Sequence, residues 1–188
     1  MAVSETNLFT KNFRGRVGNL ILRVVGEKTV LSCMPTFTNR KWSEAQLACQ
    51  DRFRKATKYG HKVMKDAEKK QFYDAKANAN QSGWNLAISD YMIKPKIVKI
   101  DVSEYGGKKG DKINIEAFDQ FKVASVIVMI INAAGVQTES GMAVEMLSGE
   151  WVYKAGSDTP GWEGGCVEVK VIDLPGNVVK EEVIIGET

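Results

Sequence analysis

The sequence contains one histidine and three cysteines, and this scarcity limits the chemistry that it can support. Cys33, Cys49 and Cys166 are odd in number and lack C-x-x-C spacing, so neither a disulfide framework nor a structural zinc site is expected. His61 lies in a lysine-rich segment without a second imidazole that could share a metal ion. We therefore expect free thiols in a reducing compartment, with no metal and no other cofactor.

The sequence also lacks a recognisable catalytic or phosphate-binding pattern. There is no G-x-S-x-G nucleophile motif, and the glycine-rich run at residues 106–110 precedes a predicted strand instead of the helix that an anion site would use. Glu181 and Glu182 are adjacent on a predicted strand, so they point to opposite faces and are typical of edge charges. These absences predict that the protein is not an enzyme.

No apolar segment is long enough to cross a bilayer, which takes about 20 residues. The longest apolar run, around residues 123–134, is interrupted by Ser125 and Asn132. The first residues lack the basic region, apolar stretch and small-residue cleavage site of a secretory signal. We expect no membrane span and cytoplasmic synthesis without a signal peptide, and incorporation into a virion or an extracellular particle stays open.

The net charge is +3, but the charged residues are distributed unevenly along the chain. Residues 1–94 contain 17 basic and 8 acidic residues, a net charge of +9, whereas residues 95–188 contain 9 basic and 15 acidic residues, a net charge of −6. Such asymmetry indicates different partners for the two halves, or contact between one half and the other. We place a domain boundary there, with a basic region at 1–94 and an acidic domain at 95–188.

Residues 17–35 predict a β-hairpin that turns at Gly26-Glu27, where glycine at the first loop position suits a type II′ turn. An isolated hairpin is marginal in water, so this one must pack on helices, extend a sheet or pair with another subunit. The alternation places two sets of side chains on opposite faces. The apolar set is Leu20, Leu22, Val24, Thr29, Leu31 and Cys33, and the other is Ile21, Arg23, Val25, Lys28, Val30 and Ser32.

A helical segment follows, beginning at Ser43, which forms a capping-box pattern with Gln46. Further helices are expected over 68–78 and 83–93, and Lys94-Pro95 ends the helical region because proline restricts the preceding residue. Two stripes run along the first helix at three- and four-residue spacing. Its apolar stripe is Ala45, Cys49, Phe53, Ala56, Gly60, Val63 and Ala67, and its basic stripe is Arg52, Lys55, Lys62, Lys65 and Lys69.

From Lys96 onward, short β-rich runs separated by turns predict an antiparallel β-sandwich of immunoglobulin-like size. The chain is thus expected to be α+β, with a hairpin, a short helical segment and a C-terminal sandwich. The seven expected strands cover 97–102, 112–118, 124–132, 141–146, 150–154, 166–172 and 178–185.

Residues 167–177, VEVKVIDLPGN, resemble the penultimate strand and turn of bacterial immunoglobulin-like and fibronectin-type modules. Asp173, Gly176 and Asn177 match the Asp-x-x-Gly-Asn turn of those modules residue by residue. The whole chain also resembles a group of uncharacterised bacterial proteins of this architecture. That likeness is carried by segments at 15–19, 43–47 and 84–91, and it implies a fold without implying an activity.

The sequence favours a structural or assembly subunit that associates with itself or with another protein, as in a phage virion or a contractile injection apparatus. One alternative is a nucleic-acid-binding accessory protein whose basic stripe follows the phosphate backbone. Another is a surface adhesion or carbohydrate-binding module, with Trp162 in a flexible loop as the contact residue. The residues expected to contact a partner are Leu20, Leu22, Val24, Leu31, Trp42, Arg52, Lys55, Lys62, Lys65, Lys69 and Trp162.

Overall fold

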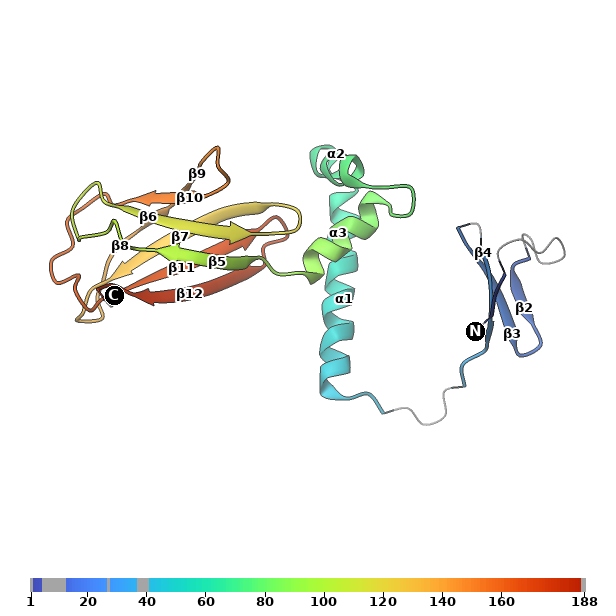
Figure 1. Cartoon of the computed structure of the whole chain (residues 1–188). Coiled ribbons are helices and arrows are strands. Elements are labelled where there is room, and N and C mark those ends of the chain that lie inside the picture. The colour runs from blue at the N-terminus through green and yellow to red at the C-terminus, as the bar shows by residue number, and fades with distance from the viewer. Residues whose placement is uncertain (1, 5–12, 27, 37–40, 187–188) are drawn as a thin grey trace. The chain divides into compact units, whose positions relative to one another are not determined.

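A computed structural model of the chain describes residues 2–4, 13–26, 28–36 and 41–186 (Figure 1). The fold is α+β, as the sequence predicts, with antiparallel sheets throughout. Contacts divide the chain into two compact units, Met1–Gln50 with Asn78–Asn80 and Asp51–Ala77 with Gln81–Thr188. The predicted boundary between residues 94 and 95 lies inside the second unit, because the helices that follow residue 50 pack against the sandwich.

The predicted hairpin consists of β3 (Leu20–Val25) and β4 (Lys28–Cys33). Leu20 pairs with Cys33 and Val25 pairs with Lys28, so the predicted register and the assignment of side chains to the two faces are confirmed. Gly26, at the start of this turn, has φ +60°, a value that is unfavourable for residues with a side chain. The other expected turn residue, at position 27, lies outside the described residues.

Two short strands extend the hairpin into a four-stranded sheet with the order β1-β4-β3-β2. β1 (Ala2–Ser4) pairs with β4, and β2 (Gly15–Val17) pairs with β3. At three residues each, these strands are too short to produce an alternating pattern in the sequence. Both backbone edges of the hairpin are therefore paired inside the chain, and what this sheet needs is a layer that covers its apolar face.

The three predicted helices are present: α1 (Glu44–Val63), α2 (Ala67–Lys76) and α3 (Gly83–Met92). The capping box is present at α1, where the Ser43 N–H donates to Gln46 Oε1 (3.0 Å) and the Gln46 N–H donates to Ser43 Oγ (3.3 Å). Asp66 caps α2 and Ser82 caps α3 in the same way, each by accepting a backbone N–H three residues later.

The second half of α1 packs closely on α3 at a glycine. A Cβ atom on Gly60 would lie 3.0 Å from Nε1 of Trp84 and 3.2 Å from Cγ1 of Ile88, so only glycine fits here without displacement. Ala56 and Val63, one turn away on either side, are buried. The apolar stripe predicted for the first helix is therefore buried only at Ala56, Gly60 and Val63, since Phe53 and the stripe residues before it are exposed, and so is Ala67, which begins α2.

The C-terminal part of the chain is a sandwich of two four-stranded sheets. One sheet has the order β5 (Lys96–Asp101), β6 (Lys112–Phe118), β10 (Trp151–Lys154), β9 (Val144–Glu145), and the other β12 (Val178–Ile184), β11 (Cys166–Asp173), β7 (Val123–Ile131), β8 (Gln137–Met142). Lettered along the chain, these are A-B-E-D and G-F-C-C′, the strand order of immunoglobulin-type sandwiches. Alternate residues of both sheets fill the core, among them Ile113, Ile115, Val126, Val128, Val167 and Val169.

Strand β8 is the main difference from the predicted strands, since the sequence placed a single strand over 141–146. Its sequence, QTESGM, is polar because it lies at the edge of its sheet and exposes most of its side chains. Gly141 is required in it, because a Cβ atom there would come within 2.8 Å of the Tyr153 ring. Backbone pairing and one close approach thus define this strand, and neither leaves an alternating apolar pattern.

Glu139 fastens β8 to the loop after β10. Its Oε1 accepts hydrogen bonds from the Tyr153 hydroxyl and the Gly156 N–H (both 2.6 Å), and its Oε2 accepts two from Ser157 (3.1 and 3.3 Å). Burial of the carboxylate acts to raise its pKa, but these hydrogen bonds outweigh burial, and the pKa of Glu139 lies below its usual value. The ionised carboxylate is therefore the form that the fold favours.

Replacing Glu139 with glutamine is expected to lower the free energy of unfolding at pH 7 by about 1 kcal/mol, because charge-assisted hydrogen bonds are lost. A depressed pKa adds stability above the unfolded-state pKa of about 4.3 and loses it as the pH falls through the folded-state value. Urea unfolding of both proteins at pH 7 and pH 3 checks this, with a difference at pH 7 that closes at pH 3. An equal difference at both pH values would mean that the charge of Glu139 is irrelevant.

Candidate functional site

The predicted partner residues of the hairpin lie together on one face of the N-terminal sheet. Leu20 is 40% exposed, and Leu22, Val24 and Leu31 are half-buried. The added strand β2 places Val17, which is 65% exposed, opposite Leu20 on the same face. We call Val17, Leu20, Leu22, Val24 and Leu31 the N-terminal apolar face; its role in binding a partner stays a prediction.

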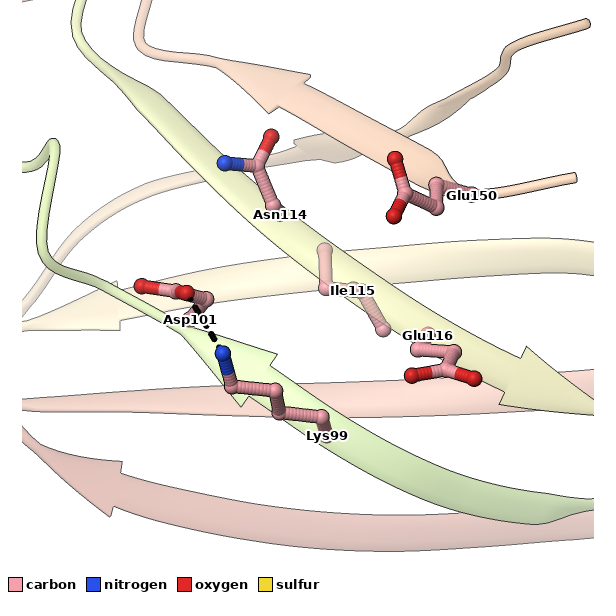
Figure 2. A pocket seen from close by; sticks show the side chains of 6 residues that line it. All are labelled: Lys99, Asp101, Asn114, Ile115, Glu116 and Glu150. Carbon is pink, nitrogen blue, oxygen red and sulfur yellow. Dashed lines mark hydrogen bonds and ion pairs between the residues drawn. The ribbon is translucent and has the colours of Figure 1, made fainter. Parts of the chain in front are cut away.

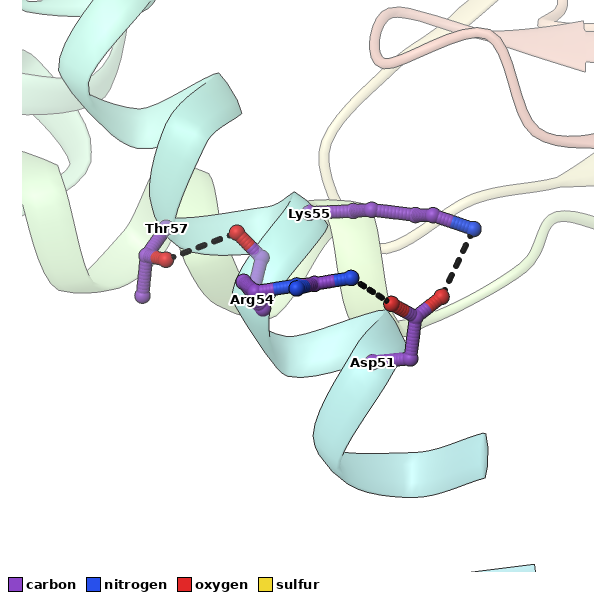
Figure 3. A network of polar contacts seen from close by, with 4 residues as sticks. All are labelled: Asp51, Arg54, Lys55 and Thr57. Carbon is purple, nitrogen blue, oxygen red and sulfur yellow. Dashed lines mark hydrogen bonds and ion pairs between the residues drawn. The ribbon is translucent and has the colours of Figure 1, made fainter. Parts of the chain in front are cut away.

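The predicted basic stripe is partly neutralised by acidic residues on the same helices. Figure 3 shows Asp51 accepting from both Arg54 and Lys55, the latter at 2.8 Å, while Thr57 Oγ1 donates to the Arg54 carbonyl. These contacts lower the pKa of the Asp51 carboxyl. Of the five stripe residues, Lys55 and Lys69 form ion pairs, Arg52 is half-buried, and Lys62 and Lys65 are exposed. The two paired lysines also remain exposed, so four of the five stripe residues face solvent, and the function of the stripe stays a prediction.

The two tryptophans expected to contact a partner have different surroundings. Trp42 precedes α1 and is 46% exposed. Trp162 lies against the sandwich core, with its ring edge-to-face on Tyr105 at a centroid distance of 6.3 Å. A Cβ atom on Gly107 would come within 2.1 Å of Trp162, so the ring fills space next to that glycine. This packing gives Trp162 a structural role at the end of the sandwich, and its role as a contact residue stays a prediction.

A polar pocket lies on the sheet that contains β5, β6 and β10 (Figure 2). It is lined by Lys99, Asp101, Asn114, Ile115, Glu116 and Glu150. Lys99 Nζ donates to Asp101 Oδ2 at 2.8 Å, and this contact, with two further hydrogen bonds from Ser103, lowers the pKa of the Asp101 carboxyl. Asn114 and Glu116 alternate with buried core residues on β6 and so face solvent. The pocket is a surface ion pair with open surroundings, and we assign no function to it.

The sandwich exposes a second apolar surface where β8 passes into β9. Met142 and Val144 are 68% and 65% exposed, and Met146 and Leu147 are also exposed. Both strands are outermost in their sheets. We call residues 142–147 the apolar sandwich edge. An exposed run of this kind is typical of an interaction surface.

Three aspartates from distant parts of the sequence meet where the helices pack against the sandwich. Asp90 lies on α3, Asp119 follows β6, and Asp173 ends β11. One carboxylate oxygen of each lies within 4.8 Å of the corresponding oxygens of the other two. Asp90 is 0% exposed and Asp173 is 2% exposed, whereas Asp119 is half-buried. We call these three residues the aspartate junction.

Asp173 is held in place by the turn that the sequence analysis recognised. Its Oδ1 accepts from the backbone N–H groups of Gly176 (2.8 Å) and Asn177 (2.6 Å), and its Oδ2 accepts from Asn177 Nδ2 (2.7 Å). The same Nδ2 lies 3.2 Å from the carbonyl oxygens of Tyr91 and Ile93 at the end of α3. This turn therefore connects the sandwich to the helix that carries Asp90.

Asp119 is positioned by the loop between β6 and β7. Its Oδ1 accepts from the backbone N–H groups of Phe121 (2.8 Å) and Lys122 (2.9 Å). The Phe121 ring packs with the buried residues of the helices, and its carbonyl accepts from Lys76 Nζ at 2.8 Å. These contacts hold the loop, and with it Asp119, against α2.

Two tyrosines form a chain of hydrogen bonds that ends at Asp90. The Tyr73 hydroxyl donates to Asp90 Oδ2, and the Tyr59 hydroxyl lies 3.2 Å from that of Tyr73. Because Tyr73 has one hydroxyl proton and gives it to Asp90, Tyr59 is the donor in the second contact. Burial raises the pKa of both tyrosines, so both hydroxyls stay protonated as donors.

The pKa values of Asp90 and Asp173 are raised because burial disfavours the charged form of a carboxylate. Burial raises the pKa of Asp90 to about 7; the Tyr73 hydrogen bond opposes this, and the charges of Asp119 and Asp173 add to it. Burial also raises the pKa of Asp173, against hydrogen bonds from Asn177 and Gly176. The positive charge of Lys76 acts to lower the pKa of Asp90 but does not offset burial, so three carboxylates in this space require a further positive counterpart or a shared proton.

Sequence reasoning missed the aspartate junction although it had noted two of its members. Asp173 was identified through its turn, and Asp90 lies in the 84–91 segment that carries the family resemblance. Nothing in the sequence indicates that these residues and Asp119 meet, because 29 and 54 positions separate them along the chain. Only the packing of α3 on the sandwich brings the carboxylates together.

No family model matches the chain. No curated protein matches it either. Among solved structures, the chain is similar to a conjugative transposon lipoprotein from Bacteroides eggerthii at 12% sequence identity, with 50% of this chain and 96% of that chain covered and a TM-score of 0.27. Similarity at this level supports no conclusion about activity, ligand or partner.

Among the residues that the structure describes, no helix is both long enough and apolar enough to cross a membrane.

Proposed function

We propose that the chain is a non-enzymatic assembly subunit that joins copies of itself head to tail. The N-terminal apolar face, on which Val17 and Leu20 are exposed, supports this proposal. In this assembly, the N-terminal apolar face of one copy covers the apolar sandwich edge of the next copy. The repeating contact suits a particle such as a phage virion or a contractile injection apparatus, with the sandwich displayed on its surface.

The need for a partner follows from the physics of a single-layer sheet. A sheet with one apolar face is stable only when a second layer covers that face. The clusters of buried residues among the described residues lie in the sandwich and around α1 to α3 beyond residue 50, and neither includes a residue of the N-terminal sheet. Burying one leucine is worth about 1.5–3 kcal/mol, so covering Val17 and Leu20 gives a useful driving force for association.

Charge favours a second copy as the partner. The basic half of the chain has a net charge of +9 and the acidic half −6. Arg16 and Arg23 are exposed on the face of the N-terminal sheet opposite its apolar face, while Glu145 and Glu150 are exposed around the apolar sandwich edge. The two contact surfaces are therefore both apolar, they differ from each other, and the opposite net charges of the two halves attract over a longer range. A contact between unlike surfaces is heterologous, which produces rings or filaments.

Substituting either Leu20 or Leu147 with glutamate is expected to weaken self-association at least tenfold, because each change places a charge in an interface that is otherwise apolar. Sedimentation velocity over a range of protein and salt concentrations measures the effect. An equimolar mixture of the two variants provides the most specific test. Each retains the surface that the other has lost, so the mixture should form 1:1 dimers and no longer species.

Val25 provides the matched control, because it is 63% exposed on the opposite face of the same sheet. The Val25→Glu variant should associate as the unmodified protein does. A protein that remains monomeric at every concentration and salt level would refute the proposal. So would loss of association that is equal in Leu20→Glu and Val25→Glu.

A further inference from the structure

Two buried carboxylate oxygens at the aspartate junction lack a donor among the residues that the structure describes. They are Asp90 Oδ1 and Asp119 Oδ2. Asp90 is 0% exposed, so its free oxygen is enclosed by protein. A buried carboxylate oxygen without a hydrogen bond is costly, and such groups are usually found with a partner. Both belong to the set of carboxylates whose oxygens approach within 4.8 Å.

The spacing of these oxygens fits coordination of one ion. Calcium binds oxygen at about 2.3–2.6 Å, so two oxygens on the same ion can lie up to about 5 Å apart. The three carboxylates therefore surround a common point without rearrangement of the elements that carry them. Asp119 and Asp173 each use Oδ1 to accept two backbone N–H groups, which fixes the direction of both carboxylates.

The donor set selects the class of ion. All three ligands are carboxylate oxygens, which suit hard cations and do not favour the softer metals that prefer sulfur or nitrogen. Magnesium demands near-ideal octahedral geometry and keeps several of its waters, whereas calcium accepts irregular geometry and mixed denticity. We propose that the aspartate junction binds a calcium ion through Asp90, Asp119 and Asp173, with water completing its coordination.

The ion would connect the helices to the sandwich. Its ligands come from α3, the loop after β6 and the end of β11, so binding crosslinks three segments that are distant in the sequence. The expectation that the protein holds no metal was based on cysteine and histidine, and it did not consider carboxylates brought together by folding. The calcium site is independent of the assembly role, because its ligands lie outside both surfaces assigned to association.

Terbium and calcium titrations of the full chain, after removal of divalent ions, test the site directly. Tyr73 donates to Asp90, so its ring lies next to the proposed ion and should sensitise terbium luminescence. Added calcium should displace terbium and quench the signal. Calcium at about 100 times its dissociation constant should also raise the melting temperature by roughly 5–10 °C. Magnesium at the same concentration should raise it less.

The Asp119→Asn variant separates ion binding from folding. An amide oxygen can still accept the two backbone N–H groups that Asp119 Oδ1 accepts, so the loop should form, and removal of one negative charge should leave the metal-free protein at least as stable. Its affinity for calcium should fall at least tenfold. Glu116→Gln removes an exposed carboxylate that does not belong to the junction and should leave the affinity unchanged.

Asp90→Asn is the second variant, and its amide oxygen can still accept from Tyr73. Circular dichroism of each variant verifies that it is folded. The proposal is overturned if millimolar calcium leaves the melting temperature unchanged and does not displace terbium, in which case a shared proton neutralises the aspartates. It is also overturned if Asp119→Asn and Glu116→Gln bind calcium equally well.

Discussion

Replacing Gly60 with leucine is expected to lower the free energy of unfolding of the helix and sandwich unit by about 2–3 kcal/mol. A Cβ atom at this position already meets Trp84 at 3.0 Å and Ile88 at 3.2 Å, and a leucine side chain adds three further carbon atoms to the same space. Leucine favours a helix over glycine by about 0.8 kcal/mol. The overpacking cost exceeds that gain, so the net effect is destabilising.

Urea unfolding followed by tryptophan fluorescence measures this change, and Ala45→Leu provides the control. Ala45 lies on the same helix but is exposed, so leucine there adds volume without overpacking and should change stability by less than about 0.5 kcal/mol. Should Gly60→Leu unfold at the same urea concentration as the unmodified protein, the close approach of α1 and α3 would be absent in solution.

Replacing Trp162 with alanine is expected to destabilise the sandwich by about 2–3 kcal/mol, somewhat below the 3–5 kcal/mol typical of a fully buried tryptophan. The ring is half-buried, packs on the sandwich core and contacts Tyr105 edge-to-face. Thermal unfolding at several protein concentrations checks the prediction. Because the ring supports its own domain, the loss of stability should not depend on concentration.

The competing role for Trp162 makes a different prediction. If this residue mainly contacts a partner or a glycan, the alanine variant will keep its stability and lose only the binding. Trp42→Ala serves as the comparison, because Trp42 lies outside the sandwich and should leave the unfolding of that domain unchanged. Equal stability of Trp162→Ala and the unmodified protein would contradict a structural role for this side chain.

Local signals in the sequence account for the parts of the fold that were predicted correctly. The capping box at Ser43 and the alternation along β11 are short-range patterns, and both appear where they were expected. The hairpin register also follows from alternation around a glycine turn, and the pairing of Leu20 with Cys33 agrees with it. Each of these features is determined within one continuous stretch of the sequence.

What the sequence did not predict depends on contacts between distant residues. Strand β8 has a polar sequence because it lies at an edge, so backbone pairing and the close approach of Gly141 to Tyr153 define it. Strand β2 is defined by pairing with β3 and is too short for a pattern. The carboxylates of Asp90 and Asp173 are 83 positions apart, and no local pattern links them. Each of these features needs the tertiary structure before it can be recognised.

The hydrogen bonds from Asn177 to the end of α3 affect the order in which parts of the protein can fold during synthesis. Its side-chain amide donates to the carbonyl oxygens of Tyr91 and Ile93 at the end of α3, residues that lie 84 to 86 positions earlier in the sequence. A ribosome that has released only the first hundred residues therefore presents a helix whose last carbonyls still lack this side-chain donor. The carboxyl end of α3 gains these hydrogen bonds only after the final β-hairpin has been synthesised.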